Sequence, residues 1–403
     1  MRLFIRPLDT QFYRDGRPFE AGIEAEALST FPPYPRTIYG ALRACILSHH
    51  LSHVWGTNWT DKGLKTVVGT PSTPSSLGSL TIRGPMVARD LTGDGTNIQI
   101  FYPAPRDLAK SKDTDTYILV SPRMDQAPLT KISDLTYSGL YPCGSETTLR
   151  LEESERLLSH DYLVPYLTGQ PPQLPKIHNP IHIYQMEPRI GIGLSRLRRT
   201  IEIGLLYAVP YVRMQDEGQA QGGLVVEVAG DDGLLPESGF LRLGGDSRPA
   251  EYKKVGNIDW DPVLNAVRAK IMETGRFKAY LITPSIFNKG WFPDFLSVQT
   301  NGLIGNLPGT TLKVQLLGAC VGRAIPIGGF DLVAGHPKPI QKAVPAGSVY
   351  FFKFQDWRAW DGATRRGNVD QLLDNLFYQS LTDRTNPQRS WKEGFGLNLI
   401  GGW

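Results

Sequence analysis

Cysteine is scarce in this chain, and long apolar runs are missing. Only three of the 403 residues are cysteines, Cys45, Cys143 and Cys320, and their wide separation and odd number argue against a disulfide framework. No segment approaches the roughly 20 apolar residues that a membrane-spanning helix needs. The first residues, MRLFIRPLD, also lack the apolar stretch of a signal peptide. We therefore expect a cytoplasmic protein.

The motifs of several enzyme classes are missing as well. The sequence contains no P-loop, no paired CxxC and no HExxH, which removes common signatures of nucleotide hydrolysis and zinc chemistry. His178 and His182 have the i, i+4 spacing of a metal-binding pair on a helix, but Pro180 between them argues against a helix there. We expect neither a metal nor another cofactor.

The composition predicts a folded protein of two domains. Apolar residues make up 41% of the chain and charged residues 20%, as is typical of a globular protein. A length of 403 residues is large for a single core. The 42 glycines and 31 prolines favour short strands and shaped loops over long helices. A formal net charge of +4 is too small to indicate a polyanion-binding protein by itself, so that case depends on local clusters.

Local patterns predict the first elements. Alternation over residues 2–6 predicts a strand. A helix is expected over about 35–50, because Ile38 and Leu42 recur at helical spacing after a proline-rich start. Gly40 in its first turn costs about 1 kcal/mol relative to alanine. We therefore expect another segment to pack closely against Gly40.

Later patterns suggest two α+β domains with antiparallel sheets, over residues 1–258 and 259–403. Residues 52–186 are rich in Pro, Ser, Thr, Gly and Asn, so we expect a large irregular insertion in the first domain. The second domain is expected to open with a helix that begins at Asp261 and ends before Gly275. Further predicted elements are strands at 277–287, 312–316 and 348–354 and a short amphipathic helix at about 368–379.

Two stretches combine glycines with basic residues. EPRIGIGLSRLRR occupies 187–199, and RAIPIGGFDLVAGHPKPIQKAVPAGSVYFFKF occupies 323–354. Arginine forks beside glycines, whose backbone amides are uncovered, suit the phosphates of a polyanion. The free amides and the dipole at the start of the helix over 35–50 suit an anion as well. We therefore predict a protein that binds RNA or DNA by its backbone. The candidate contacts are Arg14, Arg17, Arg36, Thr37, Tyr39, Arg43, Arg189, Gly191, Gly193, Arg196, Arg198, Arg199, Arg323, Gly328, Gly329, His336, Lys338 and Lys342.

Each candidate also has a structural interpretation. The arginines of 187–199 could form a solvated face with Glu187 and Glu202 as partners, and the two glycines between them could form an ordinary strand bulge. Tyr39 could be half-buried instead of stacking on a base. The 323–354 stretch could be a hairpin that packs on a neighbouring subunit. The sequence leaves these alternatives open.

Several patches of the chain, in a fixed order, carry a resemblance to a known family. They are PLDTQFYRDGRPF with FPPYPRTIYGALR (7–19 and 31–43), EPRIGIGLSRLRRTIEIGLLY (187–207), LGGDSRPA (243–250) and GGFDLVAGHPKPIQKAVPAGSVYFF (328–352). Together they resemble the third subunit of the Cmr (type III-B) CRISPR effector complexes, a family of the RAMP superfamily of RNA-binding proteins. The resemblance covers the chain except for the insertion.

The resemblance implies two ferredoxin-like (RRM-like) domains of βαββαβ type with glycine-rich loops. It also implies a non-catalytic subunit that holds the 5′ handle of the CRISPR RNA in antiviral defence. The expected protein partners are a large polymerase/cyclase-like subunit and a backbone RAMP subunit, in one hetero-oligomeric ribonucleoprotein. The terminal GFGLNLIGGW resembles the glycine-rich loop of RAMP proteins.

Two other functions remain possible at this level. Some RAMP relatives cut CRISPR precursor RNA without a metal, and His49, His50 and His53 lie near the end of the first helix, where a general base could act. Histidines at a helix end also commonly cap its last carbonyls. A purely structural adaptor would use its basic loops on acidic protein partners and would have no RNA affinity of its own.

Overall fold

The structure is a computed structural model. Three predicted residues, Arg17, His53 and Arg196, lie outside the part of the chain that it describes. That part consists of residues 1–16, 28–51, 62–70, 77–111, 116–126, 139–145, 149–150, 156–171, 177–195, 197–331 and 335–403.

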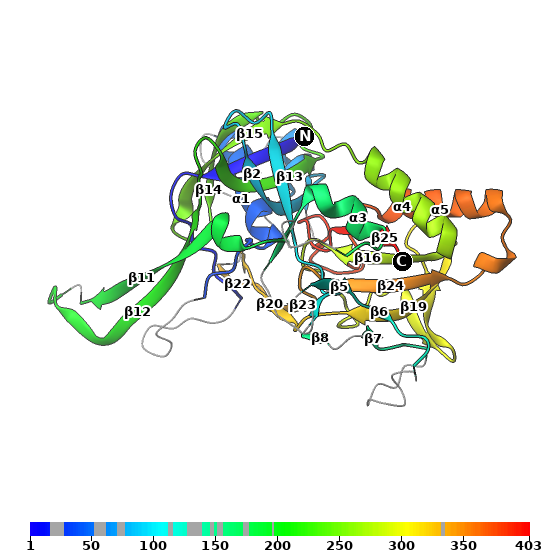
Figure 1. The fold of residues 1–403 in the computed structure, drawn as a ribbon. Helices are drawn as coiled ribbons and strands as arrows, with labels where there is room; N and C mark the ends of the chain where they lie inside the picture. Colours follow the sequence, from blue (N-terminus) through cyan, green and yellow to red (C-terminus); the bar gives the residue numbers. More distant parts are fainter. Residues whose placement is uncertain are drawn as a thin grey trace.

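An eight-stranded antiparallel sheet, built from residues before 256, forms the first half of the molecule (Figure 1). The predicted strand at 2–6 is confirmed as β1, and it lies between β13 and β15 near one end of the sheet. The strands, in spatial order, are β10 (Ile177–His178), β9 (Leu157–Ser159), β3 (Ile98–Pro103), β2 (Thr81–Asp90), β13 (Gln221–Ala229), β1 (Arg2–Pro7), β15 (Arg248–Val255) and β14 (Ser238–Leu243).

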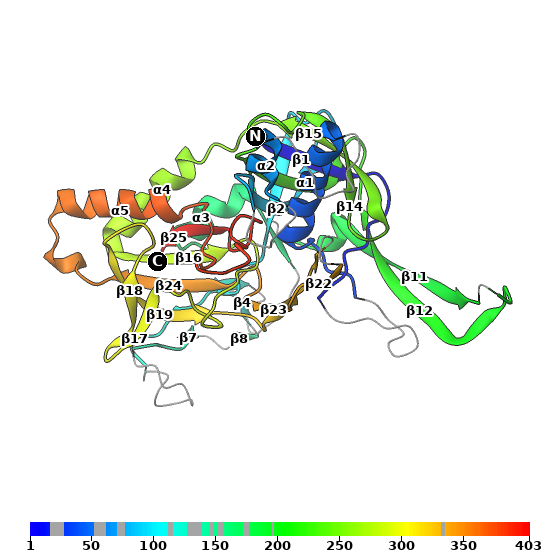
Figure 2. The ribbon, with the colours of Figure 1, turned by 180° about the vertical axis from the view of Figure 1, so that it is seen from behind.

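Two helices, α1 (Pro35–His50) and α2 (Lys62–Val68), cover one face of this sheet (Figure 2). Ile38 and Leu42 of α1 are fully buried there, which confirms the predicted helix and its apolar face. The close packing expected at Gly40 is absent, because Gly40 lies on the exposed side of α1 and a Cβ added there would meet nothing within 4 Å.

A six-stranded antiparallel sheet forms the second half. Helices α4 (Asp261–Thr274) and α5 (Gly362–Leu376) pack on one of its faces. The predicted helix over 261–274 is confirmed, and Gly275 ends it with a left-handed φ of 65°. Helix α5 begins earlier than predicted, because the Asp361 side chain caps it by accepting from the Thr364 N–H. The strands, in spatial order, are β17 (Leu296–Gln299), β18 (Gly302–Asn306), β19 (Lys313–Cys320), β24 (Val349–Phe354), β16 (Arg276–Leu281) and β25 (Asn398–Gly402).

Both sheets contain four strands in the same order. If each set is numbered along the chain, the order across the sheet is fourth, first, third, second: β15-β1-β13-β2 in the first and β25-β16-β24-β19 in the second. The expected mixed fold with antiparallel sheets is therefore confirmed. The domain boundary at 258/259 stays a prediction. In the described residues, no helix is long and apolar enough to cross a membrane.

The stretch 52–186 is more regular than its composition predicts. It supplies β2 and β3 to the first sheet, and it forms a helix, α3 (Leu163–Leu167). It also contains α2 and the edge strands β9 and β10 of that sheet. Small pairings occur as well: β4 (Leu108–Ser111) with β5 (Tyr117–Leu119) and β8 (Leu149–Arg150), and β6 (Ser121–Pro122) with β7 (Cys143–Gly144).

Both faces of the first sheet are buried. Leu3 and Ile5 of β1 belong to the core beneath α1 and α2. Phe4 points the other way and joins a core that also contains Phe277 and Phe352 of the second sheet. This alternation along β1 follows from the two-residue period of a strand, and it makes the two halves share one hydrophobic cluster.

A fully buried ion pair lies in this shared region. The Lys278 ammonium of β16 is 2.8 Å from an Asp107 carboxylate oxygen, and both side chains are almost completely shielded from solvent. The Tyr166 hydroxyl of α3 donates to the other Asp107 oxygen at 2.8 Å, and the Lys278 Nζ lies 3.7 Å from the centre of the Tyr166 ring. Burial lowers the pKa of Lys278, and the adjacent Asp107 carboxylate opposes that shift. The pair therefore joins the 52–186 segment to the second sheet.

We predict that Lys278→Met lowers the free energy of unfolding by about 3–5 kcal/mol, because it leaves the Asp107 carboxylate charged and unpaired in the core. The double variant Lys278→Met/Asp107→Leu should recover most of that loss, since it removes both charges together. Chemical denaturation of the three proteins measures both steps. A double variant no more stable than Lys278→Met would contradict this account of the pair.

Candidate nucleic-acid interface

A long β-hairpin, which we call the arm, projects from the first sheet (Figures 1 and 2). It consists of β11 (Tyr184–Leu194) and β12 (Ile201–Met214), paired antiparallel. The Gln11 and Val212 backbones exchange hydrogen bonds at its base. The predicted basic stretch 187–199 therefore forms one strand of the arm and its tip.

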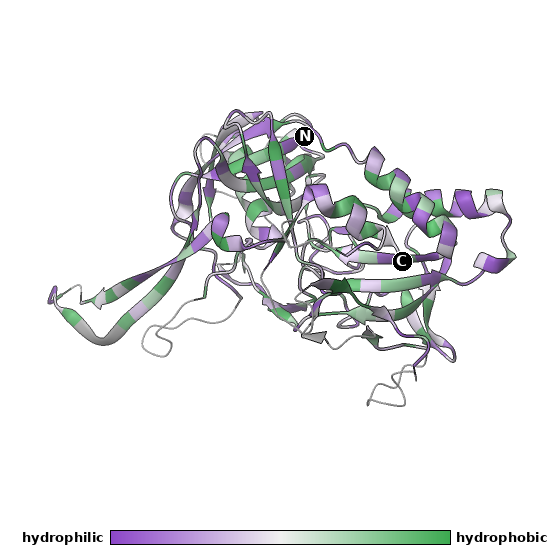
Figure 3. Cartoon of the chain, viewed as in Figure 1, coloured by the Kyte–Doolittle hydropathy of each residue, from purple (hydrophilic) through white to green (hydrophobic). Residues whose placement is uncertain are grey.

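One face of the arm is apolar. Cross-strand partners on this face are Pro188 with Pro210, Ile190 with Ala208, Ile192 with Leu206, and Leu194 with Ile201. Ile190 is 73% exposed, and its neighbours Ile192, Leu194, Ile201 and Leu206 are exposed as well. Figure 3 shows the apolar positions along the free-standing ribbon. Such a continuous exposed patch is typical of a surface that another molecule covers.

The opposite face carries arginine, tyrosine and glycine. Gly191 lies opposite Tyr207, and a Cβ added to Gly191 would be 2.2 Å from the Cζ atom of that ring. Glycine at this position thus leaves room for the exposed tyrosine ring. Gly193 follows on β11 at the irregularity between Ile192 and Leu194, as the bulge interpretation predicts.

At the base of this face, Tyr211 is the centre of a cation–π cluster. The Arg189 and Arg248 guanidinium carbons lie 4.7 and 4.5 Å from the centre of its ring. The Tyr211 hydroxyl donates to Asp246 at 3.0 Å, and Arg248 pairs with Asp9 at 3.0 Å. These contacts fix the ring between two cations, so this part of the face is rigid and paired.

Carboxylates compensate the arginines at the base of the arm. Glu187 pairs with Arg189 at 2.8 Å and with Arg213 at 2.7 Å. Hydrogen bonds from Arg213 and Arg189 lower the pKa of the Glu187 carboxyl to about 2. Arg189 therefore has Glu187 as its partner, as its structural interpretation predicts.

The tip of the arm differs from its base. Arg198 and Arg199 are exposed, and neither forms an ion pair with any carboxylate whose side chain the structure describes. The side chain of Glu202, the other partner that the structural interpretation named, lies outside that part. Arg199 adopts a left-handed φ of 51° and donates its backbone N–H to the Ser195 carbonyl at 2.8 Å. Leu197 beside them is 98% exposed. The tip thus offers two uncompensated guanidinium groups to solvent.

A second cluster forms where three predicted patches meet. Gly16 and Gly328 touch through their backbones: a Cβ on Gly16 would lie 2.6 Å from the Gly328 nitrogen, and a Cβ on Gly328 would lie 2.9 Å from the Gly16 Cα. Only glycine fits at either position without moving the chain. Arg36 of α1 lies beside this contact and donates to the Gly328 carbonyl at 3.0 Å.

Arg36 is fixed by contacts within the chain. Its Nε atom pairs with Glu393 at 2.9 Å, and its third nitrogen donates to the Gln388 side chain at 2.7 Å. Its guanidinium also lies 5.6 Å from the centre of the Phe395 ring. Arg36 therefore joins α1, the glycine loop at 328 and the C-terminal segment, and it acts on the loop by positioning it.

Lys338 adds a second cation to this cluster. Its backbone N–H donates to the Gly329 carbonyl at 2.9 Å, and burial lowers the pKa of its half-buried amine, an effect that the Glu393 carboxylate opposes. Arg43 lies on the same side of α1, with its guanidinium 5.8 Å from the centre of the Tyr39 ring.

Tyr39 and Thr37 are poorly placed to contact RNA, because neither side chain is exposed. The Tyr39 side chain is 2% exposed, its hydroxyl donates to the Leu80 carbonyl at 3.3 Å, and burial raises its pKa to about 12. Stacking on a base from this position would require the ring to leave the core. Thr37 is half-buried in the first turn of α1, where its N–H bonds the Tyr34 carbonyl.

Four other predicted contacts are exposed on loops and short strands: Arg14, Arg323, His336 and Lys342. The helix-end histidines make backbone contacts: His49 Nδ1 is 2.9 Å from the Cys45 carbonyl oxygen, and His50 Nε2 is 2.9 Å from that of Leu234. His49 thus contacts a carbonyl of its own helix, whereas His50 contacts a distant segment, so the capping interpretation does not describe His50.

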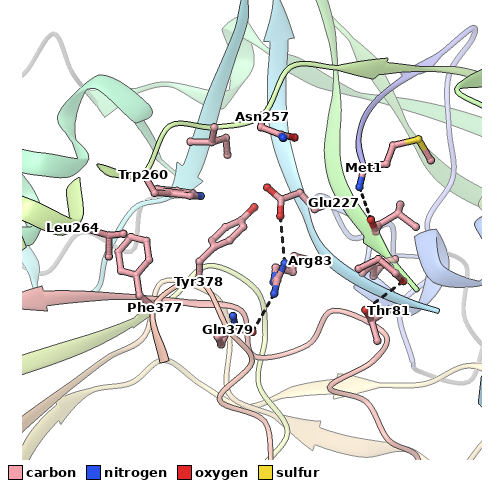
Figure 4. A pocket seen from close by; sticks show the side chains of 14 residues that line it. Met1, Thr81, Arg83, Glu227, Asn257, Trp260, Leu264, Phe377, Tyr378 and Gln379 are labelled. Carbon is pink, nitrogen blue, oxygen red and sulfur yellow. Dashed lines mark hydrogen bonds and ion pairs between the residues drawn. The ribbon is translucent and has the colours of Figure 1, made fainter. Parts of the chain in front are cut away.

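A pocket of about 440 Å³ opens between the two halves (Figure 4). Arg83 extends into it, but this guanidinium is already engaged by Glu227 at 3.6 Å, by the Gln379 side chain at 3.2 Å and by the Tyr378 ring at 5.8 Å. The Arg83 guanidinium is thus occupied by its neighbours, and we do not assign a ligand to the pocket.

Comparison with known proteins identifies the family. A family model described as CRISPR-associated protein (Cas_Cmr3) matches residues 3–403. The chain belongs to this family. The Cmr character that the sequence patches indicated is thereby confirmed. A search of curated proteins finds no match.

Two solved chains from type III-B Cmr-beta complexes are similar to this member of the Cas_Cmr3 family. One complex, bound to cognate target RNA and AMPPnP (state 1), contains a chain of 15% identity with a TM-score of 0.47; the match covers 98% of this chain and 95% of that one. The other, bound to cognate target RNA, contains a chain of 15% identity with a TM-score of 0.45, and the match covers 92% and 94%.

Sequence reasoning missed part of the site in this family member. Tyr207, Tyr211 and Arg213 lie on β12, and Arg248 lies on β15. Arg248 reaches the arm only through the pairing of distant strands, so no local pattern marks it. The two tyrosines could have been found from the sequence, because they alternate with apolar residues along β12 and so share the face of β11 that carries Arg189.

We predict that Gly328→Ala lowers stability by about 1–3 kcal/mol, because the added methyl would press on the Gly16 backbone. The matched control is Gly40→Ala, where the space is open and alanine is the better helix former, so stability should rise by about 1 kcal/mol. Thermal unfolding of both variants tests this pair. A Gly328→Ala protein as stable as the parent would show that the two backbones are not in contact.

Proposed function

We propose that this chain is the third subunit of a type III-B CRISPR effector ribonucleoprotein and a RAMP protein of the cytoplasm. In this proposal it binds the 5′ handle of the CRISPR RNA without cutting it, and it bridges the large polymerase/cyclase-like subunit to the backbone subunits in antiviral defence. The observation that carries the proposal is the arm, with its apolar face, its arginine–tyrosine face and its uncompensated basic tip.

The strand order supports two ferredoxin-like domains. A βαββαβ unit has its four strands in the order fourth, first, third, second, as in both sheets of this chain. The helices follow that plan only in part. Helix α1 follows the first strand of the first sheet and α5 precedes the last strand of the second, as the plan requires. In the first sheet, however, β14 occupies the described connection between β13 and β15, where the plan has a helix.

The arginine–tyrosine face and the tip suit single-stranded RNA. Recognition of a single strand combines neutralised phosphates with aromatic surfaces on which bases stack. Arg198 and Arg199 supply exposed charges without an ion pair to any side chain that the structure describes, and Tyr207 supplies an exposed ring. The glycine loop around Gly328 and Gly329, positioned by Arg36 and flanked by Lys338, supplies a second basic surface on the body.

The apolar face suits a protein. Its side chains are aliphatic residues and prolines in cross-strand pairs, which pack well against another apolar protein surface. We assign this face to the neighbouring backbone subunit. The same arm would then contact RNA on one side and a subunit on the other.

We predict that Arg198→Ala/Arg199→Ala weakens binding of the purified chain to RNA with an intact 5′ handle. For a single strand, each lost phosphate contact should reduce the slope of log K against log salt by about 0.7, so the double variant should lose about 1.4. The matched control is Arg242→Ala, an exposed arginine on β14 without a carboxylate partner among the described residues. Binding would be measured across a salt series in EDTA.

An unchanged salt slope in the double variant would remove the tip from the RNA site. Each sample also goes on a denaturing gel, which tests the alternative of a metal-independent endoribonuclease. Shortened RNA that disappears when His49, His50 and His53 are replaced would overturn the non-catalytic proposal. Absence of any RNA affinity would favour the structural adaptor.

We also predict that Ile190→Ser/Ile192→Ser weakens association with a co-expressed backbone subunit by about 3–6 kcal/mol and leaves RNA binding by the isolated chain unchanged. Phe240→Ser is the matched control, since Phe240 is 68% exposed and lies on β14 instead of the arm. Co-elution on size-exclusion chromatography measures the association. Equal co-elution of all three proteins would refute the assignment of the apolar face.

A further inference from the structure

Three basic residues lie together at the end of the second sheet. Arg276 begins β16 and is the direct cross-strand partner of Lys353 on β24. Arg358 in the following turn adds a third charge beside them. Like charges directly opposite each other on adjacent strands destabilise a sheet. The arrangement therefore costs stability in the free chain.

None of the three cations has a carboxylate partner within ion-pair distance among the described residues. Asp356, the acidic residue nearest in sequence, makes no ion pair with them in the described part of the chain. In the first sheet, by contrast, a cation lies opposite an acidic residue: Arg6 is the cross-strand partner of Glu251 and pairs with it at 3.1 Å. An exposed or half-buried cation cluster that is left uncompensated needs another explanation.

The cluster is also preorganised. The Arg276 guanidinium lies 5.0 Å from the centre of the Trp403 ring. That indole is held in place by its Nε1–H, which donates to the Phe277 carbonyl at 3.0 Å. Burial lowers the pKa of Lys353, and the nearby Arg276 and Arg358 charges lower it further. A bound anion would relieve this repulsion.

We propose that Arg276, Lys353 and Arg358 form a binding site for a phosphate group. Phosphate suits the cluster better than a single carboxylate does. A phosphate offers several acceptor oxygens, so it can take a bidentate bond from a guanidinium and a further bond from an ammonium at the same time. The group could belong to an RNA backbone or to a free nucleotide, which present the same chemistry to the site.

This site is separate from the arm. In Figures 1 and 2 the C-terminus, β16 and β24 lie on the side of α4 and α5, and the arm projects from the other side of the molecule. The inference does not rest on the proposed handle-binding function. It would hold for the isolated chain even if the arm bound no RNA.

The test uses the full chain, inorganic pyrophosphate as probe and the variant Arg276→Gln/Lys353→Gln. Pyrophosphate should raise the Tm of the parent chain. In the variant the affinity should fall by at least about tenfold, because two of three cations are lost. Without any ligand, at low salt, the variant should unfold at the same temperature as the parent or a higher one, since repulsion has been removed. Arg242→Gln, the same change at an isolated surface arginine, should behave like the parent.

Several results would overturn the inference. They are the absence of a Tm rise in the parent, an equal pyrophosphate affinity in parent and variant, and a lower ligand-free Tm in the variant, which would mean that the cations serve folding. The Arg198→Ala/Arg199→Ala protein should keep its pyrophosphate response, which separates this site from the arm.

Competition then identifies the source of the phosphate. Displacement of pyrophosphate by AMP indicates a free nucleotide, and displacement only by a ten-nucleotide RNA indicates an RNA backbone; both support a phosphate site. Displacement by polyglutamate but by neither phosphate compound would overturn it in favour of an acidic protein segment.

Discussion

The arrangement of the molecule depends on the Lys278–Asp107 ion pair. A charged amine and a carboxylate are tolerated in the core only because they meet each other and the Tyr166 hydroxyl. Asp107 and Tyr166 come from the 52–186 segment, and Lys278 comes from the middle of the second sheet. That segment is therefore a buried connector between the halves. The connection joins the half that carries the arm to the half that carries the cation cluster.

Local chemistry explains what the sequence could predict. Helices α1 and α4 were predictable because proline starts, apolar spacing and Gly275 lie within the segments themselves. Strand β2 was not, because it pairs with β13, more than a hundred residues further along the chain. Strand β3 depends in turn on β2 and on the distant β9. The basic stretch 187–199 was recognised, but its two-faced character appears only when β12 pairs with it. The contact of Gly16 with Gly328 likewise depends on the tertiary fold.

A formal net charge of +4 conceals how the cations are divided. Those at the base of the arm are matched by Glu187 and Asp9, and two of them, Arg189 and Arg248, hold Tyr211. Those at the tip, and the Arg276–Lys353 pair, have no such match in the described residues. Arginine count alone therefore says little about anion binding in this family member. The presence or absence of a nearby carboxylate separates structural arginines from those that are free to bind.

The arm has a consequence for how its sequence can vary. Neighbouring residues of each strand point to opposite faces, so a single deletion between Pro188 and Ile192 would turn every following side chain over. Beyond the deletion, aliphatic residues would then lie on the arginine–tyrosine face, and the polar residues would lie on the apolar face. Length changes keep the two faces apart when they add or remove an even number of residues, or when a bulge such as that between Ile192 and Leu194 absorbs the odd one. Relatives with longer or shorter arms should therefore show even changes or a bulge.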